Sequence, residues 1–88
     1  MNNYQRGMFY ISEKDIHKTP DKVAQIFASL KIVVIRCELL YFRREFEYYA
    51  MCPVFSICQE GQNIPEYRII AEFDKNDQLI EYAKVEKV

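Results

Sequence analysis

The fold is decided by residues 19–52, TPDKVAQIFASLKIVVIRCELLYFRREFEYYAMC, where helical spacing gives way to strand-forming residues. Thr19, Pro20 and Asp21 are typical of a helix start, because threonine caps, proline fits the first turn and an acidic group suits the helix dipole. The apolar residues that follow recur at helical spacing: Val23, Ile26, Phe27 and Leu30. The segment therefore predicts an amphipathic helix of about three turns.

β-branched and aromatic residues dominate after this helix. They predict two antiparallel strands, about 32–42 and 45–52, joined by a tight turn near Arg43 and Arg44. The turn contains no glycine or asparagine, so the sequence does not fix which residues of the two strands lie opposite each other.

The flanking segments complete an α+β fold. Residues 8–11 predict a short edge strand, and Ser12 with Asp15 can open a turn of helix over 12–18. Residues 67–73 and 79–85 predict a hairpin with a polar connector. We therefore expect a single domain over residues 1–88, in β-α-β-β-β-β order. One amphipathic helix packs on a mostly antiparallel four- to five-stranded sheet.

Composition limits the class of protein. The chain has 88 residues, of which 50% are hydrophobic, with seven tyrosines and six phenylalanines, so a packed core is expected. A formal net charge of −1 argues against nucleic acid as the main partner. No apolar run is long enough for a membrane span, and residues 1–6 lack an apolar leader. We expect a cytoplasmic protein, in the host cytoplasm if it is viral, with reduced and mostly buried thiols.

The three cysteines and the single histidine do not form a known site motif. Cys37, Cys52 and Cys58 have the spacing C-x14-C-x5-C, whereas zinc sites usually combine close pairs, and His17 stands among charged residues. A Cys52–Cys58 disulfide is conceivable across Pro53 but disfavoured in a reducing cytosol, and a redox role stays open. Nucleotide-binding and hydrolase motifs are lacking. We therefore expect no catalytic, metal or cofactor-binding residues.

Residues 51–70, MCPVFSICQEGQNIPEYRII, are better interpreted as a packed connection than as a site. Pro53 ends a strand because it has no N–H for the ladder. We expect the apolar residues of the loop to fill the core and residues 59–63 to turn at the surface, with positive φ at Gly61. The core-filling set is Val54, Phe55, Ile57 and Cys58.

Arginines and aromatic residues cluster on the two central strands and the turn between them. A helix covers only one sheet face. The rings occur at both odd and even positions along the strands and so point to both faces, which means that some rings should lie on the outer face or an edge. Arginine and tyrosine are enriched at protein–protein hot spots. The predicted partner-binding residues are Arg36, Tyr41, Arg43, Arg44, Tyr48 and Tyr49.

These observations favour a small non-enzymatic binding module that acts through protein–protein contact. Its size and character are those of inhibitors or adaptors among phage and mobile-element accessory proteins, an association that no motif carries. Three alternatives stay open. They are nucleic-acid binding by the same aromatic and arginine surface, a homodimer or other homo-oligomeric structural protein, and a small enzyme with a cysteine nucleophile.

Overall fold

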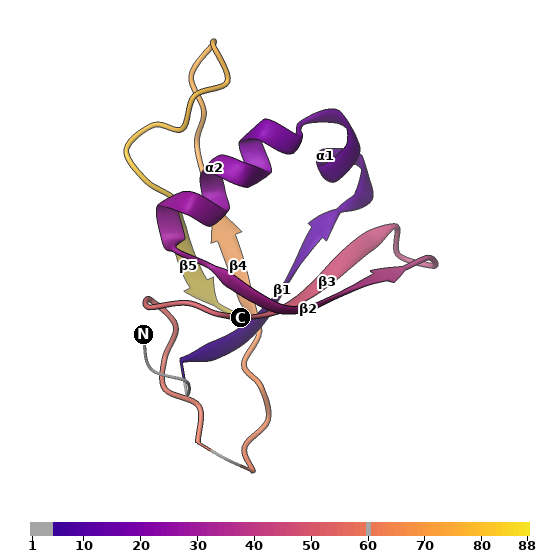
Figure 1. The fold of residues 1–88 in the computed structure, drawn as a ribbon, viewed down its shortest axis with the longest axis vertical. Coiled ribbons are helices and arrows are strands. Elements are labelled where there is room, and N and C mark those ends of the chain that lie inside the picture. The colour runs from indigo at the N-terminus through magenta and orange to yellow at the C-terminus, as the bar shows by residue number, and fades with distance from the viewer. Residues whose placement is uncertain (1–4, 60) are drawn as a thin grey trace.

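A computed structural model describes residues 5–59 and 61–88 and shows an α+β fold with antiparallel sheets (Figure 1). The N-terminal residues 1–4, where we noted the missing leader, and Glu60 of the predicted surface turn lie outside the described residues. The elements are β1 (Arg6–Ser12), α1 (Glu13–Lys18), α2 (Pro20–Leu30), β2 (Val33–Leu40), β3 (Glu45–Met51), β4 (Tyr67–Ile70) and β5 (Lys84–Lys87).

The five strands divide between two sheets. β1, β3 and β2 form a three-stranded antiparallel sheet in that spatial order, and β4 pairs with β5. A parallel bridge between Met8 and Glu66 joins the sheets, with the Met8 N–H donating to the Pro65 carbonyl at 3.0 Å. Both helices lie on one side of the three-stranded sheet (Figure 1). β1 is therefore the strand common to both halves of the fold.

The helices begin where the sequence predicts. Ser12 caps α1, because its Oγ accepts from the Asp15 N–H at 3.1 Å. Pro20 opens α2, but the Thr19 hydroxyl donates to the Asp15 carbonyl of α1 and does not cap α2. Lys31 ends α2 in the left-handed conformation. The predicted apolar stripe of α2 packs on the core.

Stacked aromatic rings form the centre of the core. Phe9 of β1 is fully buried and stacks on Tyr48 of β3, with centroids 5.2 Å apart, while Phe27 of α2 meets both rings edge-on. Phe55 and Tyr67 form a second stack at 4.3 Å. The two stacks are joined by an edge contact between Phe9 and Phe55, which ties the loop and β4 to β1.

The C-terminal hairpin differs from its prediction. β4 pairs with residues 84–87, and before residue 84 the predicted strand 79–85 contributes only the isolated Phe73–Leu79 bridge. The reason is that side chains of α2 accept hydrogen bonds from the backbone N–H groups of this segment. The Leu79 N–H donates to Gln25 Oε1 at 2.8 Å, and the Ala83 N–H donates to Ser29 Oγ at 3.1 Å.

The connection after β3 is packed, as predicted, but by fewer side chains. β3 ends at Met51, Phe55 and Cys58 are buried, and Gly61 has a φ of +88°. The prediction was wrong for Val54 and Ile57, which are 55% and 62% exposed. Phe55 stacks on Tyr67 and takes the core position beside it, whereas Val54 and Ile57 point outward.

Replacement of Phe9 with alanine tests the aromatic core. Because Phe9 is 0% exposed and contacts three other rings, Phe9→Ala should lower the free energy of unfolding by about 3–5 kcal/mol in urea denaturation. Phe42→Ala, at a position 85% exposed, is the matched control and should change it by less than about 0.5 kcal/mol. Equal losses in the two variants would contradict this core.

Candidate functional site

One half of the outer sheet face is organised around Tyr49. Tyr48 faces the core, so its neighbours on β3 face away from the helices. The Arg36 guanidinium lies over the Tyr49 ring, 5.7 Å from its centroid, and Arg6 Nη1 donates to the Tyr49 hydroxyl at 3.0 Å. Two arginines from different strands therefore hold one ring on the outer face.

The other half is organised around Tyr10 of β1. The Arg43 guanidinium lies over this ring at 4.4 Å and pairs with Glu45 at 3.3 Å. The Tyr10 hydroxyl donates to Glu47 Oε2 at 3.2 Å. Burial and the Glu47 carboxylate raise the pKa of Tyr10, which keeps this hydroxyl a donor. We call Arg36, Tyr49, Tyr10 and Arg43 the Arg–Tyr face.

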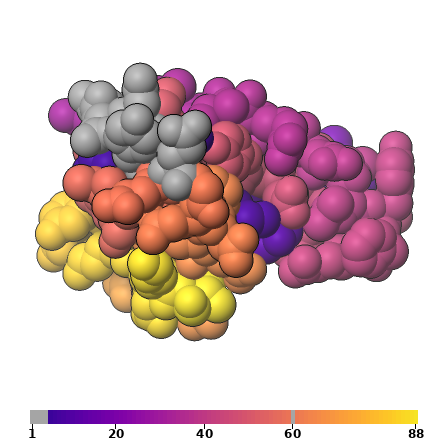
Figure 2. All heavy atoms as spheres, turned by 90° about the horizontal axis from the view of Figure 1, so that it is seen from below, coloured from indigo at the N-terminus to yellow at the C-terminus, as the bar shows by residue number. Residues whose placement is uncertain are grey.

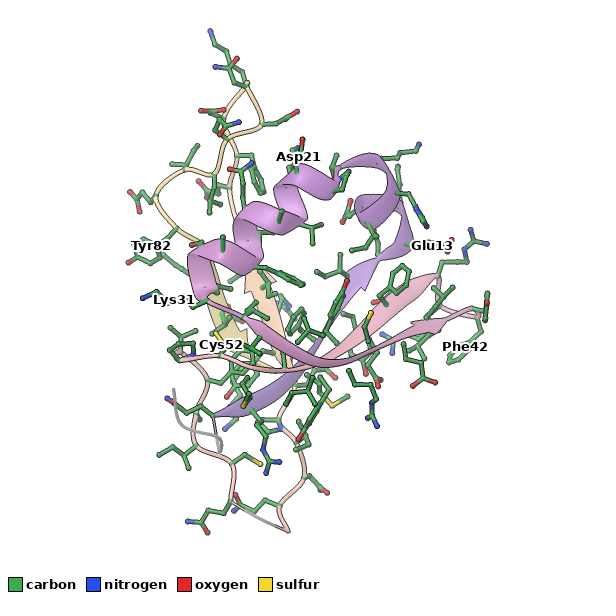
Figure 3. The ribbon with its side chains drawn as sticks, in the orientation of Figure 1. Glu13, Asp21, Lys31, Phe42, Cys52 and Tyr82 are labelled. Atoms are coloured by element: carbon green, nitrogen blue, oxygen red, sulfur yellow. The ribbon has the colours of Figure 1, made fainter. Side chains whose placement is uncertain are left out.

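The β2–β3 turn carries the most exposed rings that the structure describes. Tyr41 is 78% and Phe42 is 85% exposed, and Phe42 lies at the far end of the hairpin (Figure 3). The turn is closed by the Arg43 N–H, which donates to the Leu40 carbonyl at 3.1 Å, and Arg44 takes a positive φ of 55°. In Figure 2 the hairpin forms one end of the molecule, far from the C-terminal residues. We call Tyr41 and Phe42 the hairpin tip.

The structure brings together only part of the predicted partner-binding set. Arg36, Arg43 and Tyr49 share the outer face, and Tyr41 projects beside them from the tip. Arg44 turns toward α1 instead, where its Nε lies 2.7 Å from Glu13 Oε2.

Tyr48 is buried against Phe9, so we correct its assignment from the surface to the core. Alternation along β3 allows only one ring of the Tyr48–Tyr49 pair to face outward, and the sequence does not reveal which. Sequence reasoning missed Tyr10 and Arg6, because their partners come from a strand far away in the chain. It also left Phe42 out of the set, although its place beside the turn arginines was a usable signal.

The three cysteines are free and lie in different environments. The Cys52 thiol donates to the Leu30 carbonyl at 3.2 Å and so ties the end of β3 to the C-terminus of α2 (Figure 3). Burial raises the pKa of Cys52, which opposes its use as a nucleophile. Cys58 is also buried, whereas Cys37 on β2 is exposed, so the expectation of buried thiols holds for two of the three.

His17 and one cleft are the remaining candidate sites in the described residues. His17 is exposed, and its nearest charged partner is Glu13 at 3.8 Å, which itself pairs with Arg44. A cleft of about 550 Å³ opens where β1 and β4 diverge, with an apolar floor that includes Val23 and Ile69 and a rim of mixed charge. Within residues 5–59 and 61–88, no three histidine, cysteine or acidic side chains converge as metal ligands would.

Among the described residues, neither helix has the length and apolar character needed to cross a membrane. No protein-family model, curated protein or solved structure matches the chain.

The buried phenol of Tyr48 should make stability fall at high pH. Burial, with the neighbouring Cys37 thiol, raises the pKa of Tyr48 from 10.0 to about 12. Between these values the unfolded chain releases the proton and the folded chain keeps it, so the free energy of unfolding falls as pH rises from about 10 to about 12.

Urea unfolding across this window should show a smaller fall for Tyr48→Phe than for the natural chain, because phenylalanine cannot ionise. Lysine titration is common to both proteins and cancels in the comparison. Phe42→Ala is the control, because it changes an exposed side chain and leaves every ionisable group in place, and its pH dependence should match the natural chain. If Tyr48→Phe loses stability as steeply as the natural chain, Tyr48 does not titrate as described.

Proposed function

We propose that this protein is a small non-enzymatic binding module, which acts by occupying a partner protein's surface with the hairpin tip and the adjoining Arg–Tyr face. The observation that carries the proposal is the exposure of Tyr41 and Phe42, at 78% and 85%, beside arginines. We favour action as an inhibitor or an adaptor, in the manner of phage and mobile-element accessory proteins.

Two physical features support contact with a protein. Exposed rings at a tip gain the burial energy of a large apolar side chain only when a partner covers them. The Arg43 guanidinium is already oriented by Tyr10 and Glu45, so little conformational entropy is lost when a partner's carboxylate meets it. A suitable partner therefore offers an apolar pocket with an acidic rim.

The surface favours a protein over nucleic acid. Glu45 and Glu47 lie on the same outer face as the arginines, and Glu45 pairs with Arg43. Carboxylates beside the stacking rings repel phosphates, whereas phosphate binding needs a basic excess. The free thiols support the cytoplasm as the compartment of action.

Affinity capture from extracts of the encoding organism, with the bound proteins identified by mass spectrometry, tests the proposal. The test variant is Phe42→Ser/Arg43→Ala, which removes a tip ring and its adjacent cation but no core contact. A hot-spot pair of this kind should cost about 2 kcal/mol, or roughly a thirtyfold loss of affinity, so the specific partner should disappear.

Val54→Ser/Ile57→Ser is the matched control, because it removes two exposed apolar side chains from a different part of the surface. The partner should be retained by this control and by the natural chain. Capture that is identical for all three proteins would show that the hairpin tip does not bind. A captured species that is nucleic acid, released steeply by salt, would favour the alternative function.

A further inference from the structure

The outer edge of β2 is a free sheet edge in the described part of the chain. β2 pairs with β3 along one edge, and no other described strand occupies its second edge. Every residue from Val33 to Glu38 is exposed, because the core rings lie over β1 and β3. An open edge of this kind presents unpaired N–H and C=O groups to another strand.

We infer that this edge pairs in antiparallel fashion with the β2 edge of a second copy of the chain, with Cys37 on the twofold axis. The inference goes beyond the proposed function: it uses the backbone edge of β2, which shares Arg36 and Tyr41 with the proposed partner surface but does not include Phe42 or Arg43. It is carried by the self-complementarity of the strand.

Residues 34–40, VIRCELL, have the same chemical pattern in either direction, since two apolar residues precede and follow the triplet Arg36-Cys37-Glu38. With Cys37 on the axis, Arg36 of each copy lies opposite Glu38 of the other. The apolar residues that flank the triplet then come together at the two ends of the paired segment. Opposite charges and apolar pairs are the cross-strand contacts that stabilise a sheet.

Charge also excludes the neighbouring registers. In an antiparallel pair, two directly opposed residues either both point their N–H and C=O groups toward the other strand or both point them away. Neighbouring residues of one strand alternate in this respect, so a residue cannot lie opposite its own neighbour in a second copy. A symmetric pairing of β2 must therefore place a residue on the axis. The candidates near the middle of the strand are Arg36, Cys37 and Glu38. An axis at Arg36 opposes two arginines and an axis at Glu38 opposes two glutamates, both of which are unfavourable.

Within one copy, the charges of β2 are incompletely matched. Glu38 lies directly opposite Glu47 in the β2–β3 register, and no described residue forms a salt bridge with Glu38. Glu47 accepts from Tyr10, which leaves Glu38 beside a like charge. A second copy supplies Arg36 at this position, on both sides of the axis.

The exposed apolar residues are distributed as the dimer requires. They lie at the two ends of β2, at Val33, Val34 and Ile35 before the charged triplet and at Tyr41 after it. Antiparallel pairing brings the first end of one copy against the last end of the other. The β-bulge between Val34 and Arg36 lies outside the triplet, so residues 36–38 are regular in both copies and residue-by-residue pairing is confined to Arg36, Cys37 and Glu38.

Charge reversal tests the register in sedimentation equilibrium experiments on the intact chain. The natural chain should dimerise, and Glu38→Arg should weaken the dimer at least about tenfold, because it opposes two arginines. This variant removes the Glu38–Glu47 repulsion within one copy, so unfolding is not the cause of a lost dimer. The double variant R36E/E38R restores opposite charges and should recover dimerisation.

Cross-linking tests the position of the axis. Opposed Cα atoms in an antiparallel pair lie ~4.5–5.5 Å apart, within disulfide range. Diamide should therefore link two Cys37 thiols, taking up their two electrons and two protons as it is reduced to the hydrazine. In the control C37S/L39C the thiols introduced at position 39 of the two copies lie roughly 14 Å apart and should not link. Cys52 and Cys58 are buried in both proteins.

A natural chain that stays monomeric into the millimolar range would overturn the inference. So would a dimer that Glu38→Arg leaves intact, or one in which C37S/L39C cross-links as fast as the natural chain. These outcomes are separable from failure of the proposed function, because Phe42→Ser/Arg43→Ala leaves the charged triplet unchanged and should still dimerise. A monomeric chain that captures its partner through Phe42 would overturn the dimer alone.

Discussion

The rest of the structure depends on the close approach of Tyr67 and Phe55 to the backbone of β1 at Gly7. A Cβ atom at Gly7 would lie 2.7 Å from the Tyr67 ring and 2.9 Å from Phe55, closer than side chains tolerate. Glycine therefore lets the second aromatic stack lie directly on β1, next to Phe9. The Tyr67 hydroxyl then accepts from the Ser56 N–H at 2.9 Å, which holds the loop over the core. Both sheets are joined through this contact.

The position of the core explains the position of the exposed surfaces. A chain of this length buries only a limited share of its surface, and here the rings concentrate over β1 and β3. The strand furthest from β4, which is β2, is left with β3 as its paired strand. The hairpin that β2 and β3 form extends beyond the helices and carries the tip at its end (Figure 1). The exposure of apolar residues on β2 follows from where the core ends.

Much of the local structure follows from short stretches of sequence. Ser12, Pro20 and the apolar stripe of α2 specify both helices, since caps and helical periodicity act within a few residues. The end of β3 before Pro53 and the positive φ at Gly61 were predictable for the same reason. The candidate surface was only partly predictable. Arg36, Arg43 and Tyr49 lie together, but Arg44 and Tyr48 face other parts of the molecule.

By itself, the sequence determined the α+β class, the amphipathic helix α2 and the central hairpin, because these depend on residues close together in the chain. The tertiary structure decided which face each ring occupies, because that depends on strand register, and register is set by contacts between distant residues such as Phe9 and Tyr48. It also decided the C-terminal pairing, where Gln25 and Ser29 bind the backbone that a local hairpin would have used. The open edge of β2 was decided in the same way, by the contacts that the distant strands β1 and β4 make with each other.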